Sequence, residues 1–183
     1  MTHSKDGREY STERREPQRG KEGVEQTSTE LVVTLGELGR ALDAQPDDVS
    51  LLCDRAAVEM ALQRYEEAES DLRRASRIDA DSASVLFNLG ILLCKTARWR
   101  EAIVPLQRAV ELDESNPLGH YYLGEAYNQT DQLKLALESY EATVKLQPGN
   151  YRALKGVGIV LDKLRRPAEA TAAYQRAREA QRR

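Results

Sequence analysis

The chain has 183 residues, of which 31% are charged and only 5% are aromatic, so it contains too few large apolar side chains for a thick globular core. Its net charge of −3 and isoelectric point near 5.6 disfavour a nucleic-acid-binding protein, which normally carries a basic face. No apolar run is long enough to cross a bilayer, and the first thirty residues lack the apolar segment of a signal peptide. We therefore expect no direct membrane insertion and a cytoplasmic location.

The chain begins with a polar stretch, residues 1–26, that contains Pro17 with glycines on either side of it. Its charged and small residues cannot bury enough apolar surface to fold alone. Two interpretations remain open at this point. The stretch is either a disordered leader or cloning remnant, or an arm that docks on a partner or in a groove of this protein itself.

A single helix is predicted for residues 27–48. Four leucines recur at spacings of four, three and four residues, namely Leu31, Leu35, Leu38 and Leu42, which is typical of one apolar helix face. Ser28 or Thr29 is the expected N-cap, and Pro46 ends the helix.

A pattern with a period of 34 residues then occurs four times, at residues 49–82, 83–116, 117–150 and, one residue shorter, 151–183. The two central units share their pattern at identical offsets: Asn88, Leu89, Gly90, Ala102, Leu106 and Ala109 correspond to Tyr122, Leu123, Gly124, Ala136, Tyr140 and Thr143. The first unit departs from it, because Arg55 and Ala56 replace the leucine and the glycine. We expect Arg55 to reach solvent or a carboxylate. Pro105 lies inside a predicted helix and should kink it.

This spacing of small and large apolar residues resembles the tetratricopeptide repeat family. The resemblance implies an all-α, right-handed superhelical solenoid of antiparallel helix pairs. Nine helices are expected, because residues 27–48 would form a half repeat that caps four complete pairs. It also implies a non-catalytic scaffold or adaptor that binds a partner peptide or helix in a concave groove.

In proteins of this family the first helices of successive units line the groove. The corresponding positions here are Cys53, Ala57, Phe87, Asn88, Ile91, Tyr121, Tyr122, Glu125, Arg152, Lys155, Ile159 and Lys163. Large apolar residues gather in the middle of this set and basic residues at its end, so the predicted partner has apolar anchors and an acidic segment. The carboxylate clamp of co-chaperones is disfavoured, because each of two possible registers keeps a single match. Counted from the first unit its positions hold Cys53, Ala57, Asn88, Leu118 and Tyr122, and counted from the second they hold Phe87, Ile91, Tyr122, Arg152 and Gly156.

Catalysis, cofactors and metals are not expected. His3 and His120 lie apart from any set of metal ligands, and Cys53 and Cys94 are far apart in sequence. The run Gly156-Val157-Gly158 lacks the third glycine of a nucleotide loop and follows no predicted strand.

Two alternatives to the adaptor remain. The protein could be a structural scaffold that self-associates through its ends or convex face, and a homo-oligomer through the C-terminal helix is one form of this. It could also be a satellite subunit of a membrane-associated complex, recruited through its partner.

Overall fold

The computed structural model describes residues 19–182, with side chains from residue 28 onward, and over this part of the chain helices are the only regular secondary structure. The all-α prediction is thus confirmed. Most of the expected tail, residues 1–18, lies outside the described residues. The helices are α1 (Arg19–Ala44), α2 (Val49–Ala61), α3 (Tyr65–Ile78), α4 (Ala83–Lys95), α5 (Trp99–Leu112), α6 (Pro117–Gln129), α7 (Leu133–Leu146), α8 (Tyr151–Lys163) and α9 (Pro167–Gln181).

Helix α1 begins at Arg19, so residues 19–26, which the sequence pattern placed in the tail, are helical. Neither Ser28 nor Thr29 is therefore an N-cap, because both lie inside the helix. The pattern missed this part because residues 19–26 have no apolar spacing, although most are good helix formers. Of the expected apolar face, Leu42 is buried in the core and the other three leucines are half-buried.

The helices after α1 form antiparallel pairs, and equivalent helices begin 34 residues apart. Each pair is joined by the same turn, in which one residue adopts a left-handed conformation: Gln63, Ala97, Asp131 and Arg165, with φ between 58° and 62°. The following amide donates to a carbonyl five residues earlier, as in the bond from Arg64 N to Glu59 O of 2.8 Å. This is the Schellman arrangement that ends many helices.

Close packing within the pairs depends on glycine. A Cβ on Gly90 would lie 2.4 Å from Leu106, and one on Gly124 would lie 2.8 Å from Tyr140. Tyr140 is fully buried, and it also occupies the space beside Gly156 of the next pair. Helix α5 continues through the buried Pro105 without a break.

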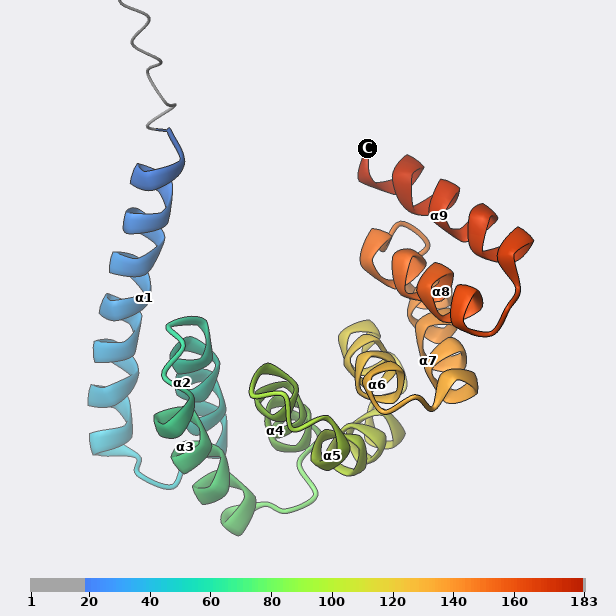
Figure 1. Ribbon diagram of the computed structural model, residues 1–183. Helices are drawn as coiled ribbons and strands as arrows, with labels where there is room; N and C mark the ends of the chain where they lie inside the picture. Colours follow the sequence, from blue (N-terminus) through green and yellow to red (C-terminus); the bar gives the residue numbers. More distant parts are fainter. Residues whose placement is uncertain (1–18, 183) are drawn as a thin grey trace, which may run out of the picture.

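The helix pairs follow one another along an arc that is open on one side (Figure 1). The first helices α2, α4, α6 and α8 contact each other in succession, whereas none of the second helices α3, α5, α7 and α9 contacts another. Since the second helices are splayed apart, the first helices lie on the inner, concave side of the arc. This places one face of each of these four first helices on a common surface.

The first pair differs from the others in its core. Arg55 of α2 donates two hydrogen bonds to Asp71 of α3, from Nε at 2.5 Å and from Nη2 at 2.7 Å. The expectation that Arg55 reaches a carboxylate is confirmed. Glu59 is also buried, at 7% exposure, and its Oε2 has no hydrogen-bond partner among the described residues. Apolar or small side chains stand at the equivalent positions in later pairs, where Leu89, Leu93 and Pro105 replace Arg55, Glu59 and Asp71.

Candidate functional site

The candidate groove lies on the inner helices, and the expected residues differ in how far they are accessible. Those of the middle are half-buried, namely Phe87, Asn88, Ile91, Tyr121, Tyr122 and Glu125, as is Ile159 of α8. Ala57, Arg152, Lys155 and Lys163 are exposed. Cys53 is buried at 4% exposure and belongs to the core of the first pair, so it offers little surface to a ligand.

Aromatic rings form a continuous row across α4 and α6. The rings of Phe87 and Tyr122 meet edge to face with their centroids 6.5 Å apart, and those of Tyr122 and Tyr121 do so at 5.5 Å. The Tyr121 ring lies 5.9 Å from that of the buried Tyr140. Half-buried aromatic rings give a ligand a large, rigid, apolar contact area at a low entropic cost.

The carboxylate of Glu125 lies beside this row of aromatic rings and is fixed in position. The Tyr140 hydroxyl donates to its Oε1 at 2.5 Å, and because Tyr140 is locked between glycines of two pairs, the carboxylate is held in place. Burial, followed by the nearby charge of Glu125, raises the pKa of Tyr121 to about 12. Burial and the hydrogen bond to Glu125 likewise raise the pKa of Tyr140. Both phenols are therefore neutral near pH 7.

The basic end of the groove is formed by α8, and its three cations are held differently. The Arg152 guanidinium lies 5.9 Å from the Tyr151 ring centroid, and its Nε donates to the Tyr151 hydroxyl at 3.3 Å. Lys163 donates to Asn128 Oδ1 at 2.8 Å, so it joins α8 to the C-terminal end of α6. Lys155 is exposed, without an ion pair among the described residues. Arg152 and Lys155 are thus the more available cations.

Sequence reasoning missed a second apolar surface, on the outside of the arc. A cleft of about 460 Å³ lies between α3 and α5, with α4 as its floor, and its apolar lining is Leu86, Leu89, Leu93, Val104 and Pro105. Val104 is 71% exposed. Charged side chains border the cleft, including Arg98, which pairs with Glu69 at 3.1 Å and with Glu101 at 2.7 Å.

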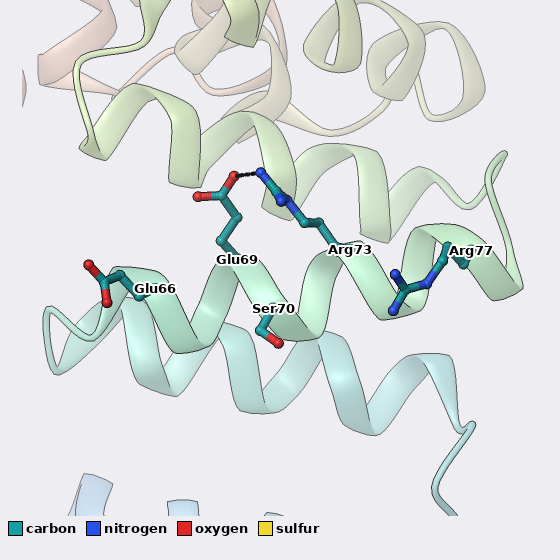
Figure 2. Close-up of a pocket in the computed structure, with 5 residues that line it drawn as sticks. All are labelled: Glu66, Glu69, Ser70, Arg73 and Arg77. Atoms are coloured by element: carbon teal, nitrogen blue, oxygen red, sulfur yellow. Dashed lines mark hydrogen bonds and ion pairs between the residues drawn. The ribbon is translucent and has the colours of Figure 1, made fainter.

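The adjoining face of α3 is charged. Figure 2 shows Glu66, Glu69, Ser70, Arg73 and Arg77 along this helix, with Glu69 paired to Arg73 at 2.7 Å. Exposed pairs of this kind contribute little stability. A comparison of equivalent positions in the repeats is the sequence signal for this cleft. Val104 is apolar, whereas the residues 34 positions before and after it are Ser70 and Glu138.

Two further properties concern only the described residues. No three histidine, cysteine, aspartate or glutamate side chains lie close enough together there to hold a metal ion. None of the helices in that part of the chain has the length and apolar character needed to cross a membrane.

Sequence comparison identifies the family. One model of the tetratricopeptide repeat matches residues 47–115, and a second matches residues 87–149 and 131–182. The chain belongs to the tetratricopeptide repeat family. The resemblance drawn from the 34-residue spacing is thereby confirmed, and repeats of this family are in general interaction modules rather than enzymes. Among proteins with curated descriptions, no sequence matches this chain.

Solved tetratricopeptide repeat structures share the fold. A crystal structure of MamA is 25% identical, with a TM-score of 0.74 over 86% of this chain and 92% of the other. MamA from Desulfovibrio magneticus RS-1 is 18% identical, with a TM-score of 0.74 over 86% and 93%. YrrB, described as a TPR protein with an unusual peptide-binding site, is 23% identical, with a TM-score of 0.70 over 87% and 82%.

Proposed function

We propose that the protein is an adaptor that binds an extended or helical peptide of a partner protein in the concave groove. The row of half-buried rings formed by Phe87, Tyr122 and Tyr121 carries this proposal. Rings placed side by side on inner helices can bury one or two apolar side chains of a ligand, as the anchors of binding hot spots do. A peptide-binding site is also described for YrrB, which shares the fold.

The basic residues of α8 give the ligand a direction. Arg152 and Lys155 lie beyond the aromatic row, so an acidic segment of the peptide would pair with them while its apolar anchors rest on α4 and α6. Lys163 is a weaker candidate for this role, because its ammonium group already donates to Asn128.

Peptides selected from a random display library against the purified protein would test the proposal, with affinities measured by titrating a labelled peptide at two salt concentrations. Tyr122→Ala should weaken binding by more than about 1 kcal/mol, with little salt dependence. Lys155→Glu should weaken it mainly at low ionic strength, because exposed charges are screened over about 10 Å at 0.1 M salt. Val104→Ala, on the outer face, is the control. If only Val104→Ala weakens binding, the groove proposal fails.

A second candidate function is structural, namely self-association through the outer face. It is favoured by Val104, whose exposure of 71% places an apolar side chain at the edge of the cleft between α3 and α5. Light scattering at several protein concentrations measures the assembly directly. Val104→Glu should abolish an assembly formed through the cleft, whereas Ala172→Glu should leave it intact, because Ala172 is the equivalent exposed position on α9. The opposite result would indicate assembly through the C-terminal helix.

A further inference from the structure

Glu125 is a carboxylate in an unusual position, because it faces the groove and yet has no cation of its own. The Tyr140 hydroxyl donates to its Oε1 and the Tyr121 hydroxyl also interacts with it, but no lysine or arginine of the described residues forms an ion pair with it. On the neighbouring helix α8, Arg152 bonds to Tyr151 and Lys163 to Asn128, so neither pairs with Glu125. Glu125 is only half-buried, so a ligand can reach it.

The surroundings of Glu125 favour a cation. Tyr121, one turn earlier on the same helix, and Tyr122 present their rings 5.5 Å apart, and the faces of aromatic rings attract ammonium and guanidinium groups. Tyr140 holds the carboxylate still through its hydroxyl, and a fixed acceptor loses less entropy when it pairs than a mobile surface carboxylate does. A carboxylate beside aromatic rings is the combination that binds a positively charged side chain.

We propose that Glu125, together with Tyr121 and Tyr122, forms a pocket for a positively charged side chain of the bound peptide. This inference rests on the proposed function and gives the ligand a charge pattern. The peptide places a basic residue against α6, and its acidic segment lies against Arg152 and Lys155 of α8. An arginine suits the pocket best, because its planar guanidinium can stack on a ring while it donates to the carboxylate.

The test uses two small probes of the same shape, N-acetyl-arginine methylamide and its uncharged citrulline analogue. Each is titrated into the isotope-labelled full chain at low salt, and the amide signals of α6 are followed by NMR. The arginine probe should shift the signals of residues 121–125 in a saturable manner, with an affinity at least about fivefold higher than that of citrulline, as expected for a cation beside aromatic rings and a carboxylate.

Glu125→Gln should reduce this preference to about twofold or less, because the amide still accepts from Tyr140 but no longer carries a charge. Glu141→Gln removes the same charge from an exposed position on α7 and should leave the preference unchanged. Equal binding of both probes to the wild-type chain, or an arginine preference that survives Glu125→Gln, would overturn the inference. The adaptor proposal would still stand if selected peptides remained sensitive to Tyr122→Ala.

Discussion

Glu59 should make the stability of the first helix pair depend on pH. Its carboxyl group is buried, and the Arg55 Nε, at 4.0 Å from Oε1, is already bonded to Asp71 at 2.5 Å. Burial, and then the negative charge of Asp71, raise the pKa of Glu59 from 4.5 to about 7, while Arg55 and Arg64 lower it only in part. Near neutral pH the Glu59 carboxyl is therefore only partly ionised in the folded protein.

The sign of the effect follows from the proton balance. Between about pH 4.5 and 7 the folded chain keeps a proton on Glu59 that the unfolded chain has lost, so the free energy of unfolding decreases as pH rises through this window. The contribution of the protonated Glu59 carboxyl to the free energy of unfolding is fully present below pH 4.5 and is lost above pH 7. The full difference is about 3 kcal/mol, most of which falls between pH 5 and pH 8.

Glu59→Gln removes the titrating group and keeps its shape. Urea unfolding of the wild type and the variant, followed by helical circular dichroism at pH 5 and at pH 8, measures the effect. The variant should be about as stable as the wild type at pH 5 and more stable by about 2 kcal/mol at pH 8. Glu66→Gln, at an exposed position on α3 and not among the charges that shift the pKa of Glu59, should show no such change. A variant that differs from the wild type equally at both pH values would refute the reasoning.

Three further changes test the packing and the turns by thermal or urea unfolding. Gly90→Ala should destabilise the protein by about 2 kcal/mol or more, because the added methyl would lie 2.4 Å from Leu106. Gly39→Ala should stabilise it by up to about 1 kcal/mol, since nothing lies within 4 Å of that position on α1; a loss of stability there would mean that the methyl meets a neighbour after all. Ala97→Gly should also stabilise, by about 0.5 to 1 kcal/mol, because φ is 58° at this turn, and an unchanged midpoint would show that the turn carries no strain.

The 34-residue spacing was sufficient to predict the helix pairs, because each pair repeats the same small and large residues. It could not place the start of α1, where residues 19–26 extend a helix without adding apolar contacts. The partner type of Arg55 could be predicted, because a charged residue at a leucine position of the repeat needs a carboxylate or solvent, and Asp71 is that carboxylate.

The candidate site was only partly visible in the sequence. The inner positions of Phe87 and Tyr122 follow from the repeat, and the structure brings their rings together. The repeat pattern places Tyr140 at a large-residue position, and nothing in one sequence indicates that its hydroxyl crosses between helices to Glu125. Glu59 alone gives no sign of burial, because an isolated glutamate usually faces solvent; its buried equivalents Leu93 and Leu161 are the signal that the repeat offers.

The position of the bound peptide tests the central claim most directly. A selected peptide carrying a nitroxide spin label broadens the NMR signals of nearby amides in the isotope-labelled protein. If the peptide lies in the concave groove, the broadening should be strongest on α4, α6 and α8 and weaker on α5 and α7, because the effect falls steeply with distance from the label. Broadening centred on α3 and α5, around the outer cleft at Val104, would contradict the account.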